Sequence, residues 1–517
     1  MVYEYFPFIY YNNSAVEQGY VGGIMQLKKM LEKTEYTLVS GTLDTEILEL
    51  VYDSRKVKPG SVFVCIKGFK IDGHDFAREV AEKGAKVLVV SQEVEVDGEV
   101  TVIRVEDTRR ALAELSAAYF DHPAAKLKTI GITGTKGKTT TSYMVRSILE
   151  NAGIKTGLLG TIEVIIGDNV IPAANTTPES YQIQECFAKM VEESCEAVVM
   201  EVSSQGLMLS RVGGFTFDYG IFTNIEPDHI GPDEHKDFEE YMACKGLLFK
   251  QCLVGIANAD DTHMEEVLKG HTCKLETYSL EKEADLMACN INLHTMDGSL
   301  GVNYDLKGLL NYSVHLNLPG KFNVYNSLTA IAICRHFGIS EENIKKALLS
   351  VKVKGRVEPV TISSKFSMMI DYAHNAMSLK SLLTTIKEYE PKRLICLFGC
   401  GGNRSKLRRY EMGEISSNLA DLTVVTSDNP RFEEPEEILK DIITGVKKGP
   451  GEYIAIIDRK EAIKYCIENA IAGDVIILAG KGHEDYQEIK GVKYKMDERD
   501  LIRQAVDEIK AEGKVIL

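Results

Sequence analysis

The residues best suited to chemistry lie in one glycine-rich segment, Gly131-Ile-Thr-Gly-Thr-Lys-Gly-Lys-Thr-Thr-Thr141. It overlaps the apolar run Leu127 to Ile132, which we expect to be a buried strand. In a strand, glycine turn and helix of this kind, backbone N–H groups surround phosphate oxygens, while Lys138 supplies a positive charge and Thr139 a hydroxyl for Mg²⁺. A chance glycine turn is the alternative, because the spacing of the first and third glycines is one residue longer than the common pattern. We predict a solvated phosphate loop made by Gly134, Thr135, Lys136, Gly137, Lys138, Thr139 and Thr140.

The composition of the chain excludes several classes of protein. A single hydrophobic core stops growing near about 250 to 300 residues, so a chain of 517 residues should form several domains, and we expect three. Hydrophobic residues make up 44% and charged residues 26%, and no run reaches the roughly 18 apolar residues of a membrane span, which predicts a globular protein without membrane insertion. The net charge of -16 disfavours nucleic-acid binding, and anionic ligands would need local basic pockets.

The cysteines indicate a reducing compartment. There are eleven, an odd number without paired short spacings, which is typical of reduced thiols in a cytoplasmic protein. Cys396 and Cys400 are the one close pair, but they lie in an apolar run and lack partners for a four-ligand zinc site. We therefore expect them to be structural.

Hydrophobic patterning divides the chain into an N-terminal extension, residues 1–24, and three α/β domains, residues 25–123, 124–355 and 356–517. The extension has neither a helical period nor the order of a signal peptide, and we expect the natural start to be Met25. The first domain is small. In the second and third domains strands alternate with helices, which indicates a mostly parallel sheet in one and a doubly wound, Rossmann-like sheet in the other. Ligands of such sheets bind at the carboxyl ends of the strands.

The wording of the phosphate loop resembles that of the Mur ligase family, whose pattern is usually Thr-Gly-Thr-Asn-Gly-Lys-Thr; here Lys136 replaces the asparagine. Further motifs follow in the family's order from about Met25 to Leu517. They are most similar to the ligase type that adds the third residue of the peptide, and they are the following: Asp53-Ser-Arg-Lys-Val-Lys-Pro-Gly60, Asp72-Gly-His74, Asn175-Thr-Thr-Pro178, Glu201-Val-Ser-Ser204, Phe222-Thr-Asn-Ile-Glu-Pro-Asp-His229, Ala243-Cys-Lys245, Gly320-Lys-Phe-Asn-Val-Tyr-Asn326, Asp371-Tyr-Ala-His374, Gly399-Cys-Gly-Gly-Asn-Arg404, Asp428-Asn-Pro-Arg431 and Gly480-Lys-Gly-His-Glu-Asp485.

The resemblance implies an ATP-dependent acid–amino-acid ligase of peptidoglycan precursor synthesis, and hence of cell-wall biogenesis, cell shape and cell division. The first domain would bind a UDP-linked muramoyl dipeptide, the central domain ATP, and the third domain the amino acid. Because a carboxylate is a poor electrophile, we expect ATP to convert it to an acyl phosphate, which a neutral amine then attacks. We expect a cytoplasmic monomer whose domains close around the acyl phosphate to exclude water.

The resemblance also implies a metal site with two Mg²⁺ ions, held by Thr139, Glu201, His229 and Lys245. Lys245 matches the lysine that the family carries as an N-carbamate, which turns a cation into an anion able to face a metal. With Lys138, the last three of these residues form the expected catalytic set. The alternatives are a surface lysine, and Glu and His side chains that are merely exposed or hydrogen-bonded.

Four more residues resemble the family's ATP contacts. Asn323 and Asn326 are three apart and would share one helix face, while Arg356 and Asp371 would close over the nucleotide from the third domain. The alternative for the two asparagines is helix capping or surface polarity.

The contacts to the UDP-peptide would come from Ser54, Thr176, Thr177, Ser203 and Arg211. An arginine suits a carboxylate because its planar fork bonds both oxygens, whereas the serine and threonines could be turn formers. His374 follows a strand, which suggests a ligand contact, although an ordinary core or orienting histidine is an equal alternative.

In the resembling ligases, Asp428-Asn429-Pro-Arg431 marks those that add meso-diaminopimelate. This amino acid differs from lysine by a far carboxylate, for which Arg431 would supply the partner. Arg404 would hold the carboxylate near the reacting amine, and Gly480 and Glu484 would accept the far ammonium. The alternatives are a turn with a surface arginine, and a lysine-adding ligase.

Some positions depart from the family's pattern: Lys136, Gln205, Ile230-Gly231, Asn375-Ala376 and Phe432, of which the last leaves the pocket wall open. Two rival functions remain. A folylpolyglutamate or cyanophycin-type synthetase would resemble the second and third domains but differ in the first, and a regulator that binds UDP-peptide without turnover would not need the intact catalytic set.

Overall fold

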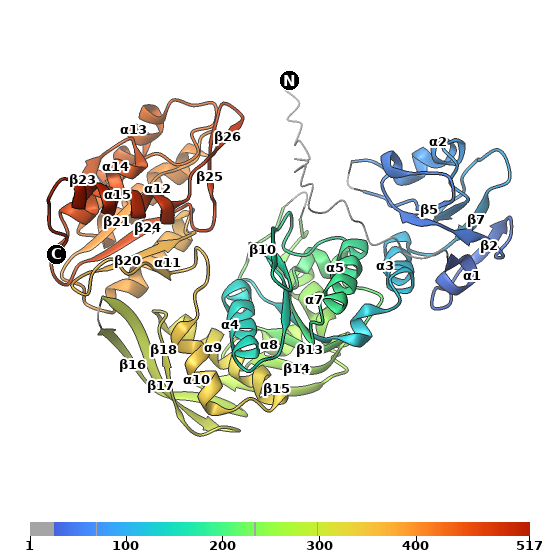
Figure 1. Ribbon diagram of the computed structural model, residues 1–517, viewed down its shortest axis with the longest axis horizontal. Helices are drawn as coiled ribbons and strands as arrows, with labels where there is room; N and C mark the ends of the chain where they lie inside the picture. Colours follow the sequence, from blue (N-terminus) through green and yellow to red (C-terminus); the bar gives the residue numbers. More distant parts are fainter. Residues whose placement is uncertain (1–24, 69, 232–233, 297) are drawn as a thin grey trace. The chain divides into compact units, whose positions relative to one another are not determined.

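The computed structural model of the protein describes residues 25–68, 70–231, 234–296 and 298–517 (Figure 1). The expected extension, residues 1–24, lies outside them. By contacts the chain forms two compact units. The first holds the described part of Met1–Lys128 with Pro178–Glu196 and Gln205–Thr216, and the second holds Thr129–Thr177, Ala197–Ser204 and Phe217–Leu517.

The first unit is built on a five-stranded sheet in the order β2-β7-β6-β5-β4. Its strands are β2 (Thr37–Ser40), β4 (Glu49–Val51), β5 (Ser61–Val64), β6 (Val87–Val90) and β7 (Thr101–Arg104). All neighbours are parallel except β2 with β7. The apolar runs Ser61 to Ile66 and Ala85 to Val90 contain β5 and β6, which are buried throughout, as is typical of central parallel strands.

Short helices complete this unit: α1 (Leu27–Met30), α2 (Ala77–Glu82), α3 (Thr108–Tyr119) and α5 (Ser180–Glu192). A two-stranded ladder of β1 (Met25–Gln26) and β3 (Glu46–Ile47) adds to it. The α5 helix packs against α3, and the rings of Tyr181 and Phe120 form an edge-type contact with their centres 5.1 Å apart. Residues 178–196, which pattern analysis assigns to the central domain, are therefore packed with the first unit.

The second unit contains an eleven-stranded sheet, parallel in its middle and antiparallel at both ends. Its strands in spatial order are β11 (Asn169–Pro172), β10 (Glu163–Ile166), β9 (Thr156–Leu159), β12 (Ala197–Glu201), β8 (Lys128–Thr133), β13 (Phe217–Phe222), β14 (Cys252–Asn258), β15 (Lys274–Ser279), β16 (Leu286–Met296), β17 (Ser299–Gly308) and β18 (Ser313–Leu316). Its longer helices are α4 (Lys138–Asn151), α7 (Phe238–Gly246), α9 (Lys321–Cys334) and α10 (Glu341–Ser350), of which α4 packs against both α9 and α10.

The C-terminal part of this unit forms a separate six-stranded sheet, parallel except for its first short strand. The order is β19 (Glu358–Pro359), β20 (Ser367–Asp371), β24 (Val475–Ala479), β21 (Leu394–Phe398), β22 (Leu422–Val425) and β23 (Glu452–Ala455). Two apolar layers cover its faces, one with α11 (Ala376–Lys387), α12 (Lys406–Leu419) and α13 (Pro435–Val446), the other with α14 (Arg459–Glu468) and α15 (Glu498–Ala511). This is the doubly wound sheet expected from the sequence (Figure 1).

Within the described residues, no helix combines the length and the apolar composition needed to cross a membrane. Burial raises the pKa of both the Cys396 and Cys400 thiols to about 12, and the Cys400 sulfur lies 3.8 Å from that of Met412. Metal ligation needs thiolates, so this environment favours the structural role predicted for the pair.

Candidate active site

The glycine-rich segment folds as a strand, loop and helix, which is the geometry predicted for a phosphate loop. The strand β8 ends at Thr133 and α4 begins at Lys138. Gly134 has a φ of 150° and Gly137 one of 84°. A Cβ at Gly134 would come within 1.9 Å of the Thr223 hydroxyl, and one at Gly137 within 2.4 Å of Asn326 Oδ1. The loop therefore requires glycine, and it lies against the N-terminus of α4, where anions are favoured.

The loop is held by the residues that follow β13. The N–H of Thr135 donates to Asn224 O at 2.9 Å, and that of Lys136 to Asn224 Oδ1 at 2.9 Å. The ammonium of Lys136 is exposed and lies 2.6 Å from Glu226 Oε2. The lysine that departs from the family's pattern is thus bonded within the protein through both its backbone and its side chain.

Lys138 is half-buried rather than solvated, which corrects the prediction of a solvated loop. Its Nζ donates to Gly134 O at 2.7 Å and to Thr135 O at 3.1 Å, because the side chain folds back over the loop. Burial lowers the pKa of Lys138, and the nearby Glu201 carboxylate opposes that effect. A cation beside the loop suits a phosphate ligand.

Glu201, at the end of β12, is fully buried and lies beside the first turn of α4. Its carboxylate accepts from Thr139 Oγ1 at 3.0 Å, from Thr161 Oγ1 at 2.9 Å and from the Thr161 N–H at 2.9 Å. A hydroxyl and a buried carboxylate are ligands that Mg²⁺ prefers, so the pair of Thr139 and Glu201 fits that ion. Across the described residues, no three His, Cys, Asp or Glu side chains gather into a group that could hold a metal ion.

Lys245, in α7, is 2% exposed, so the surface-lysine alternative is wrong. Its Nζ donates to Gly134 O at 3.0 Å and lies 4.4 Å from the centre of the Tyr241 ring. Burial first, and then the charge of Lys138, hold the pKa of Lys245 well below its ordinary value. A neutral amine is the form that reacts with CO₂, so this environment suits an N-carbamate.

His229 follows β13 with a left-handed backbone, φ 54°, and its side chain is exposed. Its Nδ1 is 2.8 Å from Glu234 Oε1. A strained backbone in a non-glycine residue is typical of functional positions. The metal role of His229 stays a prediction, as does the hydrogen-bonded alternative.

Asn323 and Asn326 share one face of α9, as expected, and both are buried. Asn326 Nδ2 donates to Asn323 Oδ1 at 3.0 Å, and Asn323 Nδ2 donates to Pro319 O at 2.8 Å. The residue at the N-cap of α9 is Gly320, so capping and surface polarity do not explain either asparagine. Instead, Asn326 Oδ1 packs on Gly137 of the phosphate loop.

Arg356 and Asp371 lie where the chain enters the C-terminal sheet. Asp371 accepts from the N–H groups of Val357 and Ala373, both at 2.8 Å. Burial raises the pKa of Asp371, and Arg356 opposes the shift. The Nε of Arg356 is buried and has no hydrogen-bond partner among the described residues. A buried unsatisfied donor needs an explanation, and an anionic ligand such as a nucleotide would provide one.

His374 is exposed, so it is not a core histidine. Its ring lies 4.6 Å from that of Tyr372, and its Nδ1 is 2.9 Å from Tyr372 O. Sequence reasoning missed His483, whose ring lies 4.6 Å from that of the same tyrosine. Burial lowers the pKa of His483 to about 4, so the imidazole is neutral at pH 7. The departure at Asn375 has a local role, because its side chain caps α11.

The residues expected to bind UDP-peptide belong to both units. In the second unit, Thr177 Oγ1 donates to Glu201 O at 3.0 Å and accepts from the Ser203 N–H at 2.9 Å. Thr176 Oγ1 lies 3.1 Å from the Thr161 hydroxyl. Thr177 therefore bonds to the backbone of Glu201, while Ser203 and Thr176 are linked to it through Thr177 and Thr161. These bonds also fit the turn-forming alternative.

Ser54 and Arg211 lie in the first unit. Ser54 begins a short 3-10 turn, and its carbonyl accepts from Lys83 Nζ at 3.1 Å. The Nε of Arg211 is 3.7 Å from Glu179, a carboxylate that Arg109 also contacts at 3.1 Å. Their roles as ligand contacts stay predictions.

Loops after β22 and β24 bring four predicted residues together around a lysine that the prediction omitted. Lys481 is fully buried, and its Nζ donates to Asn429 Oδ1 at 2.9 Å and to Glu484 Oε2 at 3.0 Å. Asp428 Oδ1 is 3.6 Å from the same nitrogen, and a Cβ on Gly480 would lie 3.1 Å from Asp428 Oδ2. The signal that could have identified Lys481 is its position in Gly480-Lys-Gly-His-Glu-Asp485, two residues after the end of β24.

Arg431, in the same loop, is not a loose surface arginine. Its backbone is left-handed, with φ 53°. Its Nη1 donates to Gly402 O at 2.8 Å and its Nε to Glu488 Oε2 at 3.1 Å. Arg404, from the loop after β21, is exposed. Phe432 is 67% exposed, so it does not form a buried pocket wall.

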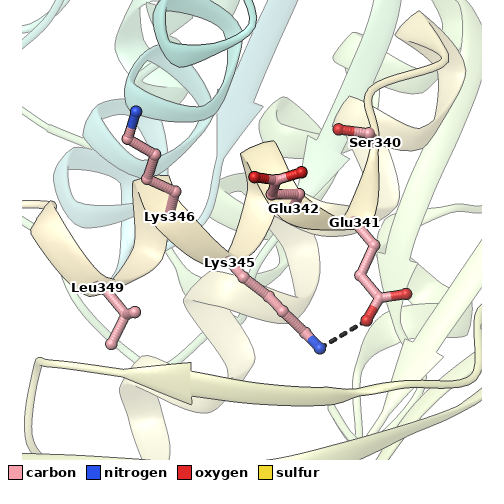
Figure 2. A pocket seen from close by; sticks show the side chains of 6 residues that line it. All are labelled: Ser340, Glu341, Glu342, Lys345, Lys346 and Leu349. Carbon is pink, nitrogen blue, oxygen red and sulfur yellow. Dashed lines mark hydrogen bonds and ion pairs between the residues drawn. The ribbon is translucent and has the colours of Figure 1, made fainter.

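A depression of about 670 Å³ lies elsewhere, on α10 (Figure 2). Its lining consists of Ser340, Glu341, Glu342, Lys345, Lys346 and Leu349. Lys345 and Glu341 form an i, i+4 ion pair at 2.5 Å across it. No predicted site residue lines this depression, and helix-surface ion pairs of this kind are ordinary.

Comparison with known proteins decides the family. The Mur ligase family catalytic domain matches residues 46–120, the Mur ligase middle domain matches residues 132–334, and the Mur ligase, glutamate ligase domain matches residues 355–482. A Clostridium perfringens protein named UDP-N-acetylmuramoyl-L-alanyl-D-glutamate--2,6-diaminopimelate ligase is 43% identical over 92% of this chain and 99% of its own. The chain belongs to the Mur ligase family. A diaminopimelate ligase 1 of Clostridium acetobutylicum is 45% identical to this Mur ligase, over 94% of this chain and all of its own.

A solved structure with the same ligase name covers 95% of this Mur ligase and all of its own chain, with a TM-score of 0.74 and 27% identity. The expected α/β Mur ligase fold is therefore confirmed. The predicted class of enzyme, a ligase, is confirmed as well.

Proposed function

We propose that this Mur ligase joins meso-diaminopimelate to UDP-N-acetylmuramoyl-L-alanyl-D-glutamate, using ATP and releasing ADP and phosphate. The names of the relatives agree with this reaction. The observation that carries it is a charge pattern at the C-terminal strand ends. The carboxylates of Asp428 and Glu484 both form ion pairs with the buried Lys481. The guanidinium of Arg431 belongs to the same loop as Asp428. Neighbouring negative and positive groups suit a ligand that carries both an ammonium and a far carboxylate.

In the proposed reaction the acceptor carboxylate attacks the γ-phosphorus of ATP, the bond to ADP breaks, and an acyl phosphate forms. The neutral amine of the amino acid then attacks the acyl carbon, loses its proton, and phosphate leaves. The glycine loop and Lys138 would bind and orient the phosphates, and Arg356 with its unsatisfied Nε would contact the nucleotide. Asn323 and Asn326 would hold the loop in place from the neighbouring helix α9.

Mg²⁺ would be held by Glu201 and Thr139, and it would supply charge neutralisation at the phosphates. We also propose that Lys245 is an N-carbamate that faces a second ion together with His229. The carbamate would remove one of two crowded cations and place an anion there instead.

The remaining assignments extend this proposal. Ser54, Thr176, Thr177, Ser203 and Arg211 would contact the UDP-peptide, His374 and Arg404 the amino acid, and Asp371 the nucleotide end of the site. We propose a cytoplasmic monomer whose three domains, residues 25–123, 124–355 and 356–517, close on the substrates.

The test is phosphate release by the purified enzyme with ATP, UDP-muramoyl dipeptide and a panel of amino acids. The proposal expects meso-diaminopimelate to be the preferred amino acid. Turnover with folate and glutamate in place of these substrates would favour a folylpolyglutamate-type synthetase. ATP-independent binding of UDP-peptide with no turnover of any amino acid would favour a regulator.

A further inference from the structure

Glu488 lies on β25 (Tyr486–Ile489), which pairs with β26 (Val492–Lys495) in a hairpin labelled in Figure 1. The Arg431 N–H donates to Glu488 O at 3.0 Å, and the Glu488 N–H donates to Asn429 Oδ1 at 2.9 Å. The carbonyl of Arg431 in turn accepts from the Lys490 N–H at 2.7 Å. The hairpin thus fixes the left-handed backbone of Arg431, which would otherwise be unfavourable.

The side chain of Glu488 holds the guanidinium as well. Arg431 Nε donates to Glu488 Oε2 at 3.1 Å, while Nη1 donates to Gly402 O at 2.8 Å on the other side. Gly401 sits so close that a Cβ there would meet Nη1 at 2.9 Å. A guanidinium has five N–H donors in a rigid plane, so two fixed bonds set the direction in which the remaining donors point.

A carboxylate at this place has an electrostatic disadvantage. Where Arg431 receives the far carboxylate of the amino acid, the Glu488 charge would repel that ligand and partly neutralise its partner. Both side chains are about three-quarters buried, at 22% and 24% exposure, so the pair is more shielded than an exposed ion pair. The benefit that offsets the repulsion is geometric, because a bidentate contact depends on the orientation of the fork.

We propose that Glu488 is a positioning residue that sets the preference for a far carboxylate by orienting Arg431. This inference rests on the proposed function. Glu488 takes no part in the bond-forming steps of the reaction. It would contact neither the reacting amine nor a lysine bound as the substrate amino acid. Its removal should therefore affect diaminopimelate and spare lysine.

The test compares Glu488→Ala with Glu488→Gln, measuring kcat/KM for meso-diaminopimelate and for lysine by phosphate release. The amide of Gln keeps an oxygen that accepts from Nε but carries no charge. We expect Glu488→Ala to lower the ratio of the two kcat/KM values about tenfold, through a higher KM for diaminopimelate. We expect Glu488→Gln to keep the ratio at the wild-type value or above, because orientation remains and repulsion is gone.

The Arg431→Ala background provides the control. There, Glu488→Ala should leave the ratio unchanged, because the side chain that it orients is absent. An equal loss for both amino acids in Glu488→Ala, or a Glu488→Gln ratio as low as that of Glu488→Ala, would overturn the inference. A wild-type enzyme with no preference for diaminopimelate would overturn the proposed specificity and the inference with it, whereas a wild-type preference that Glu488→Ala does not alter overturns the inference alone.

Discussion

Lys138 and Lys245 donate to one oxygen, the carbonyl of Gly134, at 2.7 Å and 3.0 Å. Two nitrogens that share an acceptor lie within about 6 Å of each other, where two like charges cost about 3 kcal/mol at an intermediate dielectric. Lys245 is the more buried of the two, and the pKa of its ammonium is held well below its ordinary value. Burial and the nearby Lys138 charge therefore both favour the neutral amine of Lys245, which is the form that a carbamate requires.

Replacing Lys245 by Ala should reduce amide formation by about 10²-fold or more, because it removes the anion that the carbamate would place beside the phosphates. Bicarbonate or a short carboxylic acid should restore part of the activity by replacing that anion. The measurement is phosphate release with and without the added acid. Lys250→Ala, an exposed lysine five residues further along, is the matched control and should behave as wild type. Full activity of Lys245→Ala would rule out the carbamate.

Replacing Lys138 by Ala should reduce turnover about 10³-fold, since it removes a preorganised cation from the phosphate loop. The side chain bonds only to loop carbonyls and is half-buried, so the fold should persist. Phosphate release and a far-ultraviolet circular dichroism melt measure the two effects. Substantial residual amide formation in a folded variant would contradict the loop assignment.

The fold could be read from the sequence where strands are buried on both faces. Apolar runs such as Ser367 to Asp371 and Leu422 to Thr426 form β20 and β22 nearly residue for residue, because parallel strands covered by helices are continuously apolar. The packing of residues 178–196 with the first unit could not be predicted from the sequence. The local sequence pattern of α5 carries no information about which core receives the helix.

Within the site, sequence found residues that sit in loops after strands and missed those that act through others. Lys481 and Glu488 bond to predicted residues rather than to an expected ligand, and no spacing rule links residues 429 and 481 before the chain folds. The burial of Lys138 was also missed, because it follows from the folded-back side chain. Pattern specifies chemistry at strand ends, whereas the supporting bonds depend on tertiary contacts.

Replacing Lys481 by Met should raise KM for the amino acid about tenfold or more, while KM for ATP stays near the wild-type value. Lys481 bonds to both Asn429 and Glu484, so its loss leaves carboxylates without their cation and frees the loop. The same loss should lower the free energy of unfolding by about 3 kcal/mol. Steady-state kinetics in each substrate and a denaturant titration measure these effects. An unchanged KM for the amino acid would show that Lys481 does not support the amino-acid site.

His483 should make the protein less stable as pH falls from about 6.5 to about 4. Burial, with Arg356 adding to it, lowers the pKa of folded His483 to about 4, so the unfolded chain takes up the proton first. The contribution of His483 to the free energy of unfolding is therefore fully present above pH 6.5. It is lost as the pH falls from about 6.5 to about 4, by about 3 kcal/mol at most. His483→Gln should show a smaller loss of unfolding free energy between pH 7 and pH 4.5 than wild type. Identical pH slopes, measured by urea titration, would contradict a buried neutral imidazole.

The last prediction concerns which amino acid is added. Diaminopimelate carries a far carboxylate that lysine lacks, and Arg431 is held by Gly402 and Glu488 with part of its fork still available. An unfilled site for a charged group typically costs more than about 3 kcal/mol, so the wild-type enzyme should prefer meso-diaminopimelate over lysine by at least ~100-fold.

Arg431→Ala should erase most of that preference by raising KM for diaminopimelate, while lysine turnover changes little. Arg503→Ala, an exposed arginine on α15, serves as the control and should keep the wild-type ratio. The measurement is phosphate release with the two amino acids at matched concentrations. Equal use of lysine by the wild-type enzyme would refute the specificity but leave the ligase assignment standing, because the proposed roles of the phosphate loop, Glu201 and Lys245 concern the acceptor carboxylate and do not depend on which amine follows.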